Sequence, residues 1–174
     1  MKRLFVGFPV TSAVRNRLAE WVVSQQSPDK IKWVDPKNYH MTLVFLGETD
    51  VSTIPMVEKV IHDIAKRNAP SVVYFDRLEQ KPRKTPHLIW ARWRTPKPLI
   101  QMQQELMQRL INPDYVEKRP WIGHTTLARF RHEPRNIHLN VDWEIKMPIN
   151  RLVLYESELH PKGARYNELK SFTL

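Results

Sequence analysis

The chain has 174 residues, 41% of them hydrophobic, and its 28 Lys and Arg residues against 18 Asp and Glu give a net charge of +10. This length and apolar content predict one globular domain over residues 1–174 and argue against a disordered chain. The absence of cysteine excludes disulfides, thiolate nucleophiles and Cys-based zinc sites, and it fits a cytoplasmic protein. No apolar stretch approaches the about 20 residues that a membrane-spanning helix needs.

The first half of the chain predicts alternating strands and helices. Residues 54–64 carry apolar side chains at helical spacing, at Val57, Val60, Ile61 and Ile64, which is typical of an amphipathic helix. Proline at position 55 fits the first turn of that helix. In chain order we expect a strand at 2–8, a helix at 11–25, strands at 31–34 and 39–46, and a helix at 52–67.

The second half predicts more strands and one helix. Leu99, Met102, Leu106 and Leu110 lie on one face of a helix over residues 98–111. The expected strands cover 71–78, 87–93, 121–130, 141–147, 151–156 and 165–174, with a basic loop at 81–86. This order favours an α+β fold with largely antiparallel sheets.

A His-x-Thr-Leu tetrad occurs twice, as His40-Met41-Thr42-Leu43 and as His124-Thr125-Thr126-Leu127. Because side chains alternate along a strand, each histidine shares a face with the threonine two residues later. A neutral imidazole can take a proton from water while a cationic one donates a proton to a leaving alkoxide. Threonine hydroxyls can donate hydrogen bonds to phosphoryl oxygens. The two tetrads therefore predict two half-sites for acid–base chemistry on a phosphate.

Other readings of these features stay open on the residues alone. Single His-x-Thr motifs arise by chance, and a histidine on a half-buried strand is often a structural group. The basic charge favours nucleic acid as a partner, but it also serves solubility. The histidines outside the tetrads lack metal-ligand spacing, and the four glycines form neither a Walker A loop nor a dinucleotide fingerprint. We therefore expect no metal and no cofactor.

The two tetrads and their surroundings resemble the two-histidine (2H) phosphoesterase superfamily, and within it the RNA 2′,3′-cyclic phosphodiesterases, also called 2′-5′ RNA ligases. The resemblance covers nearly the whole chain. The matching residues are Arg3 to Gly7; Trp33 and Asn38 to Glu48; Arg119 to Arg129; and Leu154, Ser157, Gly163 and Tyr166.

The resemblance implies a bilobal fold with a pseudo-two-fold arrangement, in which two antiparallel β-sheets line a central cleft and helices pack outside. It implies hydrolysis of RNA 2′,3′-cyclic phosphate ends, on tRNA fragments or nucleotides, to a 2′-phosphate and a 3′-hydroxyl. His40 would be the proton donor and His124 the proton acceptor. Thr42, Thr126 and Arg129 would bind the phosphate. We expect a monomer that is not associated with a membrane.

Two residues depart from the simplest version of this pattern. Gly123 stands where relatives often have proline. Arg129 follows His124 by five residues, so a regular strand would point it away from the groove, and a bulge or strand end near Ala128 is needed to bring it round. Three alternative functions remain at this point: 2′-5′ RNA ligation, hydrolysis of small cyclic nucleotides, and RNA binding without catalysis.

Overall fold

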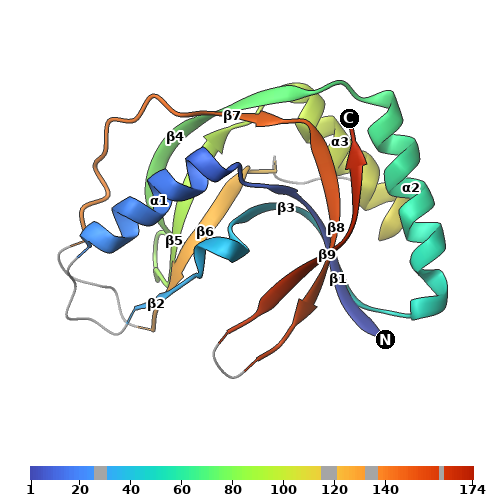
Figure 1. The fold of residues 1–174 in the computed structure, drawn as a ribbon, viewed down its shortest axis with the longest axis horizontal. Helices are drawn as coiled ribbons and strands as arrows, with labels where there is room; N and C mark the ends of the chain where they lie inside the picture. The colour runs from blue at the N-terminus through green and yellow to red at the C-terminus, as the bar shows by residue number, and fades with distance from the viewer. Residues whose placement is uncertain (26–30, 115–120, 132–136, 161–162) are drawn as a thin grey trace.

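Two antiparallel sheets form the framework of the computed structural model, which describes residues 1–25, 31–114, 121–131, 137–160 and 163–174 (Figure 1). The four-stranded sheet has the order β3-β1-β8-β9, and the five-stranded sheet has the order β2-β6-β5-β4-β7. The strands are β1 (Lys2–Pro9), β2 (Lys32–Trp33), β3 (His40–Thr49), β4 (Ser71–Lys81), β5 (Leu88–Arg94), β6 (His124–Arg129), β7 (Lys146–Ile149), β8 (Arg151–Glu158) and β9 (Arg165–Thr173).

The helices in the described ranges are α1 (Ser12–Ser24), α2 (Ile54–Arg67), α3 (Lys97–Leu110) and the short 3₁₀ helices η1 (Pro36–Asn38) and η2 (Val51–Thr53). The predicted apolar stripe of α2 is buried. Its predicted start is two residues early, because Asp50 accepts a hydrogen bond from Ser52 N and begins η2 instead. The α+β class and the antiparallel sheets are confirmed.

The two sheets are built in corresponding ways. β1 and β3 pair antiparallel and are separated in sequence by α1, and β5 and β6 pair antiparallel and are separated by α3. The orders β3-β1-β8-β9 and β6-β5-β4-β7 then match strand for strand. The bilobal, pseudo-two-fold architecture places one tetrad on β3 and the other on β6.

Helices pack against both sheets on the sides away from the tetrads (Figure 1). α2 and α3 contact each other, and they contact β3, β8 and β9 of the four-stranded sheet. α1 lies by the five-stranded sheet, where its Trp21 contacts Trp33 of β2 edge-on and donates a hydrogen bond from Nε1 to the His138 carbonyl at 3.0 Å.

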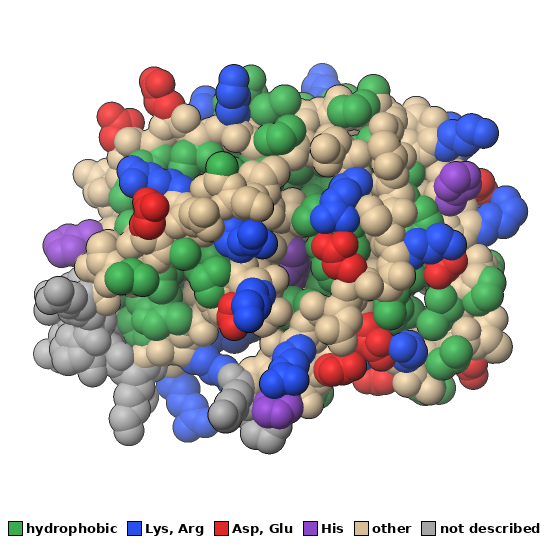
Figure 2. Space-filling model, viewed as in Figure 1, with side chains coloured by type: hydrophobic (Ala, Val, Ile, Leu, Met, Phe, Trp, Pro, Cys, Tyr) green, Lys and Arg blue, Asp and Glu red, His purple; other side chains and the backbone are tan. Residues whose placement is uncertain are grey.

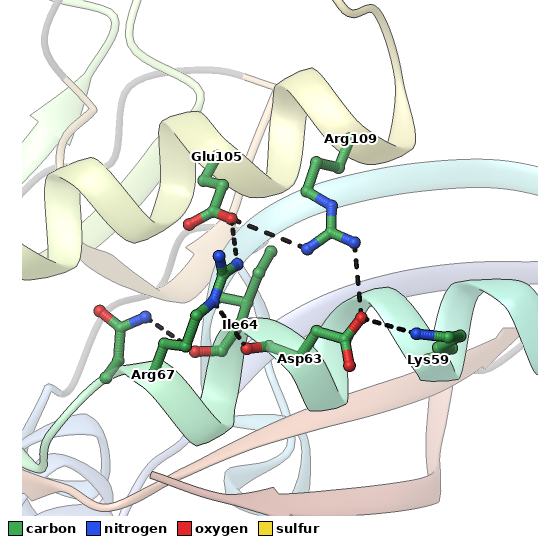
Figure 3. A network of polar contacts seen from close by, with 7 residues as sticks. Lys59, Asp63, Ile64, Arg67, Glu105 and Arg109 are labelled. Atoms are coloured by element: carbon green, nitrogen blue, oxygen red, sulfur yellow. Dashed lines mark hydrogen bonds and ion pairs between the residues drawn. The ribbon is translucent and has the colours of Figure 1, made fainter.

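A polar network joins α2 to α3 across their exposed surfaces (Figure 3). Asp63 of α2 accepts from Lys59 at 3.0 Å and pairs with Arg109 of α3 at 3.6 Å. Glu105 of α3 pairs with both Arg109 and Arg67. The network is solvent-exposed, so it adds little to stability, and the buried stripes of the two helices carry the packing.

The strand predicted at 31–34 covers only Lys32–Trp33, and two other predicted strands start several residues later than expected. The strand at 121–130 begins only at His124, although the buried Gly123 still accepts a hydrogen bond from Trp93 N of β5 through its carbonyl at 2.9 Å. The strand at 141–147 begins at Lys146, and Ile145 meets the sheet through a hydrogen bond from Phe75 N to its carbonyl. Arg119 and Pro120 of the second motif block lie outside the described residues.

Candidate active site

The two tetrads face one groove between the sheets. This cavity of about 520 Å³ is lined by His40 and Thr42 from β3, and by His124, Thr126 and Arg129 from β6. The structure therefore brings together all five residues predicted for the site. Met41, Leu43, Thr125 and Leu127, between and after them, are 0–3% exposed and face the core, as strand alternation requires.

A bulge turns Arg129 into the groove. In the pairing of β5 with β6, Trp90 lies opposite Thr126 and Ile89 opposite Ala128, so Leu127 is the extra residue. Leu127 and Ala128 are both buried in succession, and Arg129 emerges on the side of the histidine. This is the irregularity that the five-residue spacing demands.

The same irregularity occurs in the first half-site. In the pairing of β1 with β3, Leu43 is the extra residue between Thr42 and Val44. Residues 40–45 and 124–129 consequently share one pattern of burial, and Phe45 lines the groove at the position equivalent to Arg129. Phe45 is covered by the guanidinium of Arg3 at 4.7 Å from the ring centroid.

Close contacts of two glycines with Met41, and one hydrogen bond, hold β3 in place. A Cβ atom at Gly7 would lie 2.9 Å from the carbonyl oxygen of Met41, and one at Gly123 would lie 2.8 Å from Met41 Sδ. Trp121 Nε1 donates a hydrogen bond to the Thr42 carbonyl at 3.1 Å. Trp121 therefore ties the second motif segment to the first motif strand.

His40 is oriented by two hydrogen bonds. Its Nδ1 lies 2.6 Å from the Asn38 carbonyl, and its Nε2 lies 2.9 Å from Thr42 Oγ1. Because a carbonyl only accepts, Nδ1 carries the proton in the neutral ring, and Nε2 accepts from the threonine hydroxyl. Phe5 and Tyr166 pack on the imidazole at 4.7 and 4.9 Å between centroids.

This enclosure makes His40 hard to protonate. Burial is the main cause that lowers the pKa of His40 to about 4, and the nearby His124 lowers it further, against the opposing effect of the Asn38 hydrogen bond. In the free protein at neutral pH, His40 is therefore a neutral imidazole whose Nε2 lone pair accepts from the Thr42 hydroxyl.

His124 has a different environment on the opposite sheet. Its Nδ1 donates to the Ile122 carbonyl at 2.8 Å, and its ring stacks on Trp90 of β5 at 3.7 Å and 22°. Burial lowers the pKa of His124, while the Ile122 hydrogen bond and the charge of Glu79 raise it. Glu79 of β4 lies opposite Trp90 in the sheet register. The Glu79 carboxylate thus favours the cationic form of His124. The charge of His124, in contrast, disfavours the cationic form of His40.

Sequence reasoning did not assign Trp90, Glu79, Phe5 or Tyr155 to the site. Tyr155 lies 5.9 Å from His40 between ring centroids. Their placement depends on which strands become neighbours, and a single sequence carries no direct signal of that. Among the described ranges, no group of three or more His, Cys, Asp or Glu side chains is arranged to hold a metal ion. No helix in those ranges is long and apolar enough to cross a membrane.

Comparison with known proteins agrees with this geometry. Residues 8–90, which include the first tetrad, match the model of the LigT-like phosphoesterases. The "RNA 2′,3′-cyclic phosphodiesterase" of Bacillus subtilis is 27% identical over 98% of this chain and 95% of its own length, so the similarity extends through the second tetrad. The chain is thus similar to the LigT-like phosphoesterases over just under half of its length, and to this Bacillus subtilis protein over nearly all of it.

Solved structures of similar proteins share the fold. The protein TT0787 of Thermus thermophilus superposes with a TM-score of 0.84 at 26% identity, covering 99% of this chain and 97% of that one. Escherichia coli LigT, in a complex with 3′-AMP, has a TM-score of 0.83 at 24% identity, with 99% and 98% covered. The predicted fold is therefore confirmed, as is the predicted resemblance to these phosphoesterases.

Proposed function

We propose that this protein is an RNA 2′,3′-cyclic phosphodiesterase, which hydrolyses the cyclic end to a 2′-phosphate and a 3′-hydroxyl. The observation that carries the proposal is the presence of two oriented His-Thr pairs on facing strands of one groove. It is supported by full-length relatives from Bacillus subtilis and Archaeoglobus fulgidus that bear this name. The substrate is RNA, and the cysteine-free sequence supports a cytoplasmic enzyme.

In the proposed reaction, His124 Nε2 takes a proton from water as the water oxygen attacks phosphorus. The bond from phosphorus to O3′ breaks, and His40 Nε2 gives a proton to O3′. Thr42, Thr126 and Arg129 bind the non-bridging oxygens, on which negative charge accumulates. The chemistry needs two proton carriers on opposite sides of the phosphate, and histidines on two facing sheets satisfy this without a metal.

Because His40 is neutral in the free protein, binding of the substrate must help to protonate it. His40 must acquire a proton at Nε2 before it can act as the acid, although burial disfavours its cationic form. The cyclic phosphate is an anion, and an opposite charge within a few ångströms raises a histidine pKa. Substrate binding is therefore expected to charge His40, and the Thr42 hydroxyl then turns from donor to acceptor or binds the phosphate.

The activity is tested with an oligonucleotide that ends in a 2′,3′-cyclic phosphate, incubated with the folded protein in EDTA from pH 5 to 8. We expect turnover to a 2′-phosphate, and we expect His40→Ala and His124→Ala to lower kcat by orders of magnitude. An intact substrate would contradict the function, and tight RNA binding without turnover would favour a non-catalytic binding module. Loss of activity in EDTA that added metal restores would contradict metal independence.

The roles of the two histidines are separated by a substrate whose O3′ is replaced by sulfur. A thiolate leaves without a general acid, so this substrate should restore much of the rate of His40→Ala but not that of His124→Ala. Rescue of His124→Ala instead would reverse the assignment. Arg129→Ala should lower kcat/KM by about tenfold or more, consistent with the loss of a charged hydrogen bond to phosphate.

A further inference from the structure

A second cavity adjoins the active-site groove on the other side of His40. It has a volume of about 400 Å³, and it shares the wall residues Asn38, His40 and Tyr166 with the groove. Its remaining walls come largely from the start of α1, from η1 and from the connection between β7 and β8. In Figure 2, Lys and Arg side chains lie around a hollow near the centre of the face where Figure 1 places these elements.

The charges of this cavity suit an anion. Among the residues that the structure describes, Arg15, Lys37 and Arg151 line it with a single carboxylate, Glu168, which leaves a net charge of +2. Glu168 is bound by Arg151 at 2.9 Å, whereas Arg15 and Lys37 form no ion pair within the described residues. By contrast, a third cavity near Trp143 is lined by two cations and three carboxylates and has a net charge of −1.

Two further polar features of its walls favour a ligand that supplies hydrogen-bond partners. Thr11, at the start of α1, makes no side-chain capping hydrogen bond, and the first turn of this helix has no acidic residue, so its N–H groups and dipole favour an anion. Tyr39 is 4% exposed, and its hydroxyl has no hydrogen-bond partner in the described part of the chain. A buried polar group without a partner is unfavourable, and a ligand that supplied the partner would recover that free energy.

We propose that this second cavity binds the ribose and phosphodiester of the nucleotide that precedes the cyclic phosphate end. The inference rests on the proposed function, because it places the cyclic end in the groove beside His40. The preceding phosphate is one ribose away from the reacting phosphorus, and the cavity that carries unpaired cations shares His40 with the groove. The enzyme is then built for the end of an RNA strand, and a cyclic mononucleotide leaves this cavity unfilled.

The test compares kcat/KM for a cyclic mononucleotide, uridine 2′,3′-cyclic phosphate, with that for the dinucleotide UpU ending in the same cyclic phosphate. The wild-type protein should prefer the dinucleotide. The double variant Arg15→Ala/Lys37→Ala should lose about tenfold in kcat/KM for the dinucleotide, the equivalent of about 1.4 kcal/mol, and should keep its value for the mononucleotide. Lys66→Ala/Lys97→Ala is the matched control, because both lysines are exposed and line none of these cavities.

Equal loss for both substrates, no loss for either, or the same loss in the control variant would each overturn the proposal. If the wild-type protein turns over neither substrate, the proposed function fails. The role of the second cavity is then tested by measuring the affinity for nucleotides instead of their turnover. Calorimetry would then compare uridine 2′-phosphate with UpU 2′-phosphate. The double variant should weaken only the dinucleotide, and equal affinities of the wild-type protein for the two products would overturn the inference.

Discussion

Replacing His40 with asparagine should make the stability of the protein less sensitive to acid. The asparagine amide can still donate to the Asn38 carbonyl that now accepts from Nδ1, but it does not titrate. The pKa of His40 is about 4 in the folded protein against an ordinary value of 6.5. Since one pKa unit corresponds to about 1.36 kcal/mol, the folded state disfavours the charged ring by roughly 3 kcal/mol.

The sign follows from proton uptake. The unfolded chain binds a proton at His40 below pH 6.5, and the folded protein does so only near pH 4, so wild-type stability falls as the pH drops through this window. Between pH 7 and pH 5, about 2 kcal/mol of the free energy of unfolding should be lost through His40 alone. Other groups contribute to the pH dependence equally in the variant.

Urea denaturation at pH 7 and pH 5 measures this difference for the wild-type protein and for His40→Asn. The control is His62→Asn, the same chemical change at an exposed histidine of α2. The wild-type protein and the control should lose about 2 kcal/mol more than His40→Asn on acidification. If all three lose the same amount, His40 does not titrate as an enclosed imidazole, and its proposed activation by the substrate anion is refuted.

Three further results are expected. The pH profile of kcat/KM should be bell-shaped with both limbs below pH 6.5, because burial lowers the pKa of both His40 and His124 in the free protein; a limb above pH 7 would contradict this. Trp90→Leu should lower kcat/KM about tenfold and should shift the pKa of His124, which NMR titration measures. Trp90→Phe should retain most of the stacking on His124. Equal effects of the two variants would argue against a stacking role. Gly7→Ala should cost about 1–3 kcal/mol of stability and reduce kcat. The new Cβ would push the carbonyl of Met41 and displace the strand that bears His40. Unchanged denaturation and kinetics would show that the strand is not held there.

Much of the candidate site could be predicted from sequence because it depends on local geometry. Strand alternation alone puts His40 with Thr42 and His124 with Thr126, and the structure has both pairs in the groove. The five-residue spacing to Arg129 even required the bulge that the structure shows at Leu127.

The parts that sequence reasoning missed depend on contacts between distant segments. Trp90 meets His124 only because β5 pairs with β6 in one register, and Tyr166 meets His40 through the ordering of the four-stranded sheet. The start of β6 at His124 likewise depends on its pairing with β5. Neither the partner nor the register is encoded in a local pattern.

The matched bulges in β3 and β6 also bear on regioselectivity. Two half-sites with the same backbone path, the same His-Thr pair and the same burial pattern face the two ester oxygens of a cyclic phosphate. The backbone of the half-sites therefore gives by itself no preference for releasing O3′ over O2′. The choice must come from residues that break the equivalence, and the first to do so after each tetrad are Phe45 in one half-site and Arg129 in the other.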